Sequence, residues 1–301
     1  MSGESFVYLL ESLTKTLVYS GTFIGIGTCT FRWLLLPHLK SQNLISLELR
    51  QKTIRVGLGA AWLTILALFL RAWAHTVAAF GFEESLVLEN LYLIAVKSRW
   101  SEGWKLQCFA AVTFLCTFLW TRRYETSGWV ASSLAVLVLA VTLPLLGHAS
   151  GNTSTELLHT VHILSAGTWL GTLFVLMVAS SVQNKNKTAE SKDLQAILLR
   201  KFSAVAMTGA GVLVASGIVS TTLHLGNISN LWMTPYGRTL VLKVLIFLCI
   251  AACGYTNWRY FQQVENITAE PRHKIIVMEL TLAAAAILIT GMFTELPRPH
   301  H

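Results

Sequence analysis

Apolar runs of about twenty residues dominate the sequence, and most of its charged residues lie between these runs. A helix needs about twenty predominantly apolar residues to cross the hydrocarbon core of a bilayer. Eight such segments can be counted, at approximately residues 15–37, 55–80, 104–121, 129–147, 156–182, 202–225, 237–258 and 275–293. None of them has the sustained apolar–polar alternation of a membrane barrel strand. We therefore predict an all-α, polytopic membrane protein, a helical bundle with eight transmembrane helices.

The composition agrees with this class. Only 13% of the 301 residues are charged and 53% are hydrophobic, whereas soluble domains carry about 25% charged residues. A net charge of +8 would suggest a nucleic-acid partner in a soluble chain. In a membrane chain it indicates cationic loops on one side of the bilayer, so we expect a lipid bilayer and no nucleic acid as partner. The five cysteines form no C-x-x-C pair and are expected to be packing residues.

The loop charges predict an orientation. The connections after the first, third, fifth and seventh segments hold fourteen lysines and arginines, and the other side of the membrane holds six. Loops rich in lysine and arginine stay in the cytoplasm. Both termini are therefore expected outside.

Three histidines gather near the start of the fifth segment. His159 and His162 lie three positions apart, so a helix places them on one face about one turn apart. His148 ends the fourth segment, and only a short polar linker, residues 150–155, separates it from the fifth. We interpret the three imidazoles as a metal site, because neutral imidazole is a common ligand of copper and zinc. Two alternatives remain open: interfacial histidines bonded to carbonyls and water, and axial ligation of haem b by His148 and His162.

Three further residues on the predicted outer side are weaker metal-site candidates: His75, His224 and Met233. Isolated histidines near a helix end are usually interface residues, and methionines in so apolar a chain usually pack. A thioether such as that of Met233 nevertheless suits Cu(I).

Among the charged residues within predicted spans, two are singled out as functional candidates, because insertion of a charge into the membrane costs about 2.5–3.5 kcal/mol. Lys243 lies about two turns from the outer end of the seventh segment, and Glu279 about one turn from the inner end of the eighth. Their depths differ by about 10–15 Å, so no direct pair is expected; Glu279 has Arg259 or Arg55 within reach. We regard both residues, together with Trp169 on the histidine face of the fifth segment, as candidates for lining a transport path. A structural role for each is the alternative.

Several motifs occur in a characteristic order: Gly147-His148-Ala149, His159-x-x-His162, Trp169-Leu170-Gly171, Thr234-Pro235-Tyr236-Gly237-Arg238 with Leu242-Lys243, and Glu279-Leu280. This ordered set resembles the CopD family of bacterial copper-resistance membrane proteins, which includes PcoD and YebZ proteins. The likeness is strongest from His148 to the end. The first half resembles the family only loosely, at residues 25–37 and at Ser98-Arg99-Trp100.

The resemblance implies a multi-pass protein of the bacterial inner membrane that serves copper homeostasis and moves copper inward from the periplasm. It also implies a partner, a small periplasmic copper-binding protein called CopC, which some members carry fused. Residues 1–301 are expected to form one membrane domain, most characteristic at 147–295, without a separate soluble domain. Two other functions stay open: a haem-binding or redox membrane protein, and a non-transporting scaffold for copper delivery or assembly. Neither an ATP-driven pump nor an enzyme is expected, because the sequence holds no nucleotide-binding motif and no nucleophile–base pairing.

Overall fold

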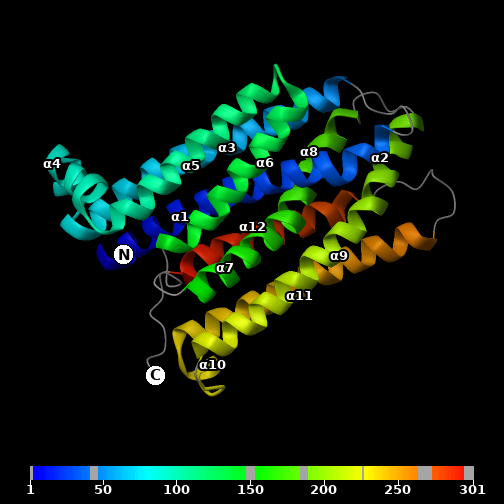
Figure 1. Ribbon diagram of the computed structural model, residues 1–301. Helices are drawn as coiled ribbons and strands as arrows, with labels where there is room; N and C mark the ends of the chain where they lie inside the picture. The colour runs from blue at the N-terminus through cyan, green and yellow to red at the C-terminus, as the bar shows by residue number, and fades with distance from the viewer. Residues whose placement is uncertain are drawn as a thin grey trace.

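The computed structural model describes residues 3–40, 47–146, 153–183, 189–225, 227–263 and 273–294. Helices and short turns account for this described part of the chain, and it holds no strand. The long helices lie side by side in an elongated bundle (Figure 1). The predicted all-α class is thus confirmed.

Each of the eight predicted segments is helical over its described residues. The long elements are α1 (Gly3–Thr30), α3 (Leu47–Phe80), α5 (Trp100–Thr121), α6 (Glu125–Thr142), α7 (Thr153–Ala166), α8 (Thr172–Gln183), α9 (Ala189–Leu225), α11 (Pro235–Gln263) and α12 (His273–Phe293). The short elements are η1 (Phe31–Leu35), α2 (Leu36–Lys40), η2 (Glu84–Leu86), α4 (Leu88–Tyr92), η3 (Leu93–Lys97), η4 (Leu143–Leu146), η5 (Gly167–Gly171) and α10 (Asn230–Met233). The π-helical turn η1 joins α1 to α2, and the π-helical turn η5 joins α7 to α8, so each group forms one continuous rod.

Six helical stretches are long and apolar enough to cross a membrane, as judged by length and composition among the described residues. They are Leu47–Phe80, Trp100–Thr121, Glu125–Leu146, Thr153–Ala179, Ile197–Leu225 and Pro235–Arg259. A shorter apolar helix covers Val277–Phe293, and α1 does not belong to the six. A multi-pass membrane protein follows from these helices, while the count of eight spans stays a prediction.

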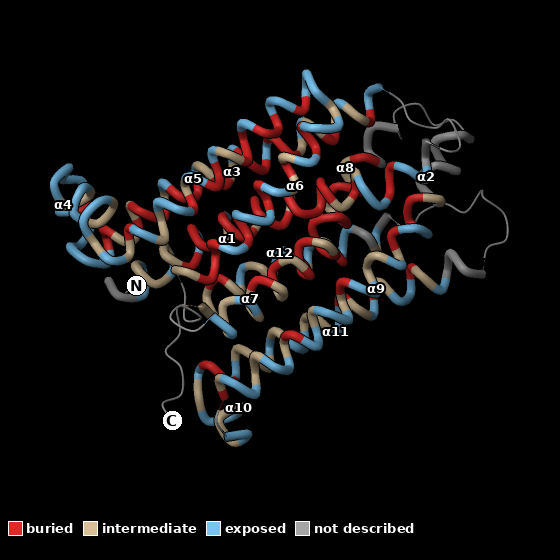
Figure 2. The backbone as a smooth tube through the Cα atoms, in the orientation of Figure 1, coloured by how far each residue is buried: buried red, intermediate tan, exposed pale blue. Residues whose placement is uncertain are grey.

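The outer surface of the bundle is apolar. Large side chains such as Trp62, Phe109 and Leu134 are exposed, and exposed residues mark the outward faces of the long helices (Figure 2). A water-soluble protein rarely exposes a contiguous apolar surface of this kind. The surface therefore suits lipid chains.

Helix α1 occupies the centre of the bundle and packs against α3, α12 and η5. It approaches η5 backbone to backbone, because a side chain on Gly27 would collide with the main chain of Gly171. The reverse holds for Gly171, whose missing side chain leaves room for the carbonyl of Phe23. Small residues allow such close crossings of membrane helices. Gly27 thus allows α1 and η5 to cross closely.

The first and last helices of the chain meet at one end of the bundle. The hydroxyl of Tyr8 donates a 2.7 Å hydrogen bond to the carbonyl of Met292. The start of α1 and the end of α12 therefore lie at the same end of the bundle.

Candidate functional site

The side chains of His159 and His162 lie together on one face of α7. Their rings are nearly parallel, with an interplanar angle of 10° and centroids 6.4 Å apart. This is the arrangement that a spacing of three residues predicts for a helix. Both side chains are half-buried, so they are partly shielded from the surroundings.

Ser216 on α9 lies against the ring of His162. The Oγ of Ser216 lies 3.0 Å from Nδ1 of His162, and the same hydroxyl lies 3.0 Å from the carbonyl of Leu213. A serine hydroxyl has one proton to donate; when that proton goes to the Leu213 carbonyl, Ser216 accepts the bond from a protonated Nδ1. Nε2 of the neutral ring then carries a lone pair. Metal-binding histidines are commonly oriented in this way, with the other ring nitrogen donating to a fixed partner.

Tyr19 on α1 holds the second imidazole. Its hydroxyl lies 3.3 Å from Nε2 of His159, and the tyrosine itself is buried. Three helices, α1, α7 and α9, therefore converge on the two histidines. Neither Tyr19 nor Ser216 belonged to the predicted site, because one tyrosine or serine in an apolar segment carries no signal of its tertiary partner.

Lys243 on α11 approaches the same region. Its ammonium group lies 4.8 Å from the centroid of the Phe293 ring on α12, a cation–π geometry. It is also close enough to act electrostatically on His162. Lys243 thus lies in the same region of the bundle as His162.

The weaker metal-site candidates lie elsewhere. Nδ1 of His75 is 3.0 Å from a carboxylate oxygen of Glu11, and its ring stacks on Trp100. Glu11 and Tyr19 are eight residues apart on α1, which separates the two histidine environments by about 12 Å along the axis. His75 is therefore not joined to the pair.

His224 and Met233 are likewise separate from the pair. Nδ1 of His224 donates to the carbonyl of Ser220 within its own helix at 2.7 Å, and eight residues of α9, about 12 Å, separate His224 from Ser216. Met233 is 75% exposed.

The remaining candidate, His148, lies outside the described residues. Among the residues that are described, no three His, Cys, Asp or Glu side chains are grouped closely enough to hold a metal ion.

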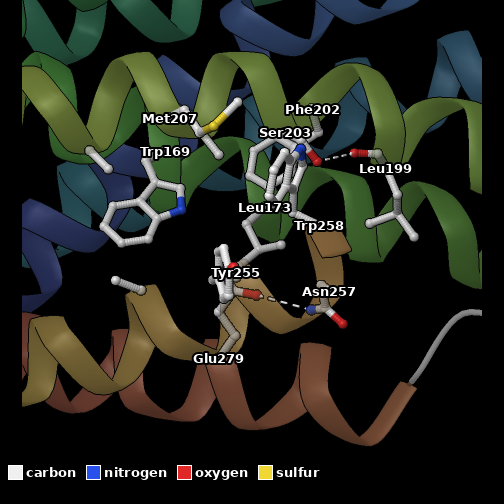
Figure 3. A pocket seen from close by; sticks show the side chains of 14 residues that line it. Trp169, Leu173, Leu199, Phe202, Ser203, Met207, Tyr255, Asn257, Trp258 and Glu279 are labelled. Atoms are coloured by element: carbon white, nitrogen blue, oxygen red, sulfur yellow. Dashed lines mark hydrogen bonds between the residues drawn. The ribbon is translucent and has the colours of Figure 1, made fainter. Parts of the chain in front are cut away.

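A cavity of about 290 Å³ opens deeper in the bundle. It lies between α8, α9, α11 and α12, and Trp169 and Glu279 both line it (Figure 3). Trp169 follows His162 by seven residues, so the cavity begins about 10 Å further along the same helical rod. Two of the three path candidates thus share one cavity, whereas Lys243 does not line it.

Glu279 is paired with an amide instead of an arginine. Nδ2 of Asn257 lies 3.4 Å from Oε2 of Glu279, and both residues are buried. In the described part of the chain no guanidinium lies within 4.0 Å of this carboxylate, so the suggested partners Arg259 and Arg55 do not contact it. Arg259 follows Asn257 by two positions, which turns it about 200° around the helix. It therefore lies on the side of α11 that faces away from Glu279.

The cavity also contains polar groups that were not predicted. Oδ1 of Asn257 is buried and has no hydrogen-bond partner among the described residues. The thioether side chain of Met207 lines the cavity as well. An asparagine inside an apolar span is a signal that could have pointed to Asn257, since buried amides in membranes need partners. Met207 gave no such signal among many apolar neighbours.

Two family profiles match the chain. Residues 9–157 match the family profile described as "Copper resistance protein D-like, N-terminal domain", and residues 196–293 match that described as "Copper resistance protein D". The likeness therefore extends over the first half of the chain, where the motifs gave only a loose match. His159, His162 and Trp169 fall between the two matched regions, and Lys243 and Glu279 fall inside the second.

One curated relative is the copper transport protein CutJ of Bacillus subtilis (strain 168). It is 24% identical over 294 residues, which cover 95% of this chain and 52% of that protein. The chain thus spans about half the length of this relative. No solved structure matches the chain.

Proposed function

Because the chain belongs to the copper resistance protein D family, we propose that it serves copper homeostasis by binding copper at one end of its bundle and moving it across the membrane. The observation that carries this proposal is the pair of stacked imidazoles, His159 and His162, held by Tyr19 and Ser216. Imidazole is a suitable copper ligand. His148 is the proposed third ligand, since it precedes α7 by only five residues.

The proposed topology has eight spans in a bacterial inner membrane, with both termini and the histidine pair on the periplasmic side. The excess of cationic residues in alternate connections supports this orientation. The direction proposed is import, from the histidine pair toward the cytoplasmic face. A CopC-like periplasmic protein is the proposed donor of copper to the exposed end of the site.

The proposed path leads from the histidine pair past Trp169 into the cavity beside Glu279. An ionisable group buried within a membrane bundle commonly marks an ion pathway. Glu279, the unpartnered Oδ1 of Asn257 and the thioether of Met207 give the cavity three groups that can face a cation. Thioethers in particular suit Cu(I).

Metal analysis of the purified protein tests the binding site. We expect stoichiometric copper in the wild type and its loss in the double variant His159→Ala/His162→Ala, with His224→Ala as a matched histidine control that keeps its copper. Full copper content in the double variant would contradict the site. An optical spectrum of the same samples separates copper from haem b, because a Soret band in the wild type would identify a haem protein instead.

Vesicle uptake tests transport. Wild type reconstituted into sealed vesicles is expected to move copper across the bilayer, whereas the double histidine variant is not. Stoichiometric binding without flux in either direction would replace the transporter by a scaffold that hands copper to a partner.

A further inference from the structure

A second pocket, of about 310 Å³, lies between η1, α3, the end of α5 and the start of α6. Arg32 on its wall follows Tyr19 by thirteen residues, which is about 20 Å along α1 from the histidine pair. In Figure 1 this region lies at the end of the bundle where α2 is labelled, away from the start of α7. The pocket is therefore separate from the proposed copper site.

Four arginines line this pocket together with a single carboxylate. Glu125 accepts a hydrogen bond from Arg32 at 3.2 Å and also pairs with Arg50. Arg122 and Arg123 have no carboxylate within 4.0 Å among the described residues. The one acidic group is already shared, so the pocket keeps a strong excess of positive charge.

Arg32 is fixed in place and keeps an unused donor. Its guanidinium lies 5.4 Å and 5.9 Å from the ring centroids of Trp33 and Trp129. Its Nε is buried and lacks a hydrogen-bond partner within the described part of the protein. A buried donor without an acceptor is costly, which points to a ligand with acceptor oxygens.

The charge identifies the class of ligand. A copper ion is repelled by four guanidinium groups, so the pocket is not an outlet for copper. Guanidinium groups bind phosphate oxygens through paired, charge-assisted hydrogen bonds. Basic pockets between membrane helices on the cytoplasmic side bind anionic lipid headgroups.

The aromatic residues around the pocket favour a lipid over a free anion. Trp33, Trp120 and Tyr124 are exposed near the same end of the bundle, and Trp120 packs edge-on against Tyr124. Tryptophan and tyrosine gather where a membrane protein crosses the headgroup layer. The pocket therefore lies at the depth of lipid phosphates.

We propose that this pocket, defined by Arg32, Arg50, Arg122, Arg123 and Glu125, binds the phosphate group of an anionic phospholipid. The bound headgroup would contact η1, α3 and the α5–α6 turn, the same three parts of the chain that contribute Arg32, Arg50 and Glu125 to the pocket. The inference does not depend on copper binding.

Native mass spectrometry of the detergent-solubilised full chain tests the proposal with phosphatidylglycerol and phosphatidylcholine as probes. The wild type is expected to retain phosphatidylglycerol preferentially. The variant Arg122→Gln/Arg123→Gln should bind it about tenfold to thirtyfold more weakly, since each cation near a membrane surface contributes substantially to anionic-lipid binding. The matched control, Lys97→Gln/Arg99→Gln, removes two exposed cations elsewhere in the chain and should bind like wild type.

Three results would overturn the proposal: equal retention of both lipids by the wild type, unchanged phosphatidylglycerol binding in the double arginine variant, or an equal loss in the control. Displacement of the lipid by millimolar inorganic phosphate would overturn the lipid assignment in favour of a free anion. If the double arginine variant does not fold, the wild type alone still tests the proposal. Its retention of phosphatidylglycerol and phosphatidylcholine is then compared at low and high salt. Copper content, measured in parallel, should stay unchanged in both variants, which separates this site from the proposed function.

Discussion

The hydroxyl of Ser216 can select which nitrogen of His162 carries the proton. When the hydroxyl donates its hydrogen bond to the Leu213 carbonyl, it accepts one from Nδ1, and the lone pair of the imidazole then resides on Nε2. A partner of this kind typically contributes tenfold to a hundredfold to metal affinity. In the proposed copper site, Nε2 of His162 would then be the ligand atom.

The substitution Ser216→Ala tests this orientation. We expect copper affinity to fall by about tenfold to a hundredfold, measured by titration against a competing chelator. Ser220→Ala, one turn further along α9, is the matched control and should bind copper like wild type. Equal affinities for Ser216→Ala and wild type would contradict the assigned tautomer.

Lys243 is expected to weaken copper binding at the pair. Its positive charge acts on His162, and two cations in a bundle of low dielectric repel one another. Replacing it by methionine should raise copper affinity by roughly tenfold, equivalent to about 1.4 kcal/mol. Lys243→Arg keeps the charge and should not tighten binding. A weaker site in Lys243→Met would instead assign Lys243 a supporting role.

The sequence predicted the part of the site that local spacing determines. His159 and His162 share a helix, so their juxtaposition follows from the helical repeat alone. Tyr19, Ser216 and Asn257 reach their partners from other helices, and no local pattern encodes such contacts. His75 does not join the pair for the same reason. Its side chain is paired with Glu11 on α1, a tertiary contact that no local pattern encodes.

At the scale of helices, the crossing of α1 and η5 depends on two glycines. The backbones of Gly27 and Gly171 approach so closely that neither position has room for a side chain. Apolar periodicity predicted both helices but not the π-helical turn, since one extra residue in a turn leaves the pattern of an apolar segment unchanged. The crossing fixes α7 and its histidines relative to α1.

Gly171→Ala should therefore destabilise the protein. The new methyl group must displace the α1 backbone at Phe23, and overpacking of this kind costs about 1–3 kcal/mol. Thermal unfolding in detergent measures the loss. Gly211→Ala is the matched control, because nothing lies within 4 Å of the position its side chain would take. Equal stability of the two variants would contradict the close crossing.

At the scale of the whole molecule, the apolar segments predicted a helical bundle. Its orientation in the membrane was predicted from the loop charges alone. Thr126 lies at the start of α6 beside the arginine pocket, and Glu89 lies on α4; both are exposed. We expect a cysteine at position 89 to react with an impermeant maleimide in spheroplasts, and one at position 126 only after permeabilisation. Both variants need a background without the five native cysteines. The opposite labelling would place the histidine pair in the cytoplasm.

Movement of copper through the bundle requires the buried carboxylate to face a cation. Glu279 is 2% exposed, bonded to one amide, and lines the cavity that begins about 10 Å beyond the histidine pair. A negative charge there offsets the cost of bringing a metal cation into the membrane interior, and glutamine preserves the shape while removing the charge. Glu279→Gln should therefore bind copper at the histidine pair with unchanged stoichiometry.

Uptake of copper by vesicles carrying Glu279→Gln should nevertheless fall about tenfold or more. The variant loses the attraction between the carboxylate and the passing copper ion, which exceeds about 1.4 kcal/mol in a bundle of low dielectric. Thr281→Val, on the exposed side of the same helix, is the matched control and should transport like wild type. If Glu279→Gln binds and transports copper normally, the carboxylate is a structural partner of Asn257. In that case the cavity is not the route.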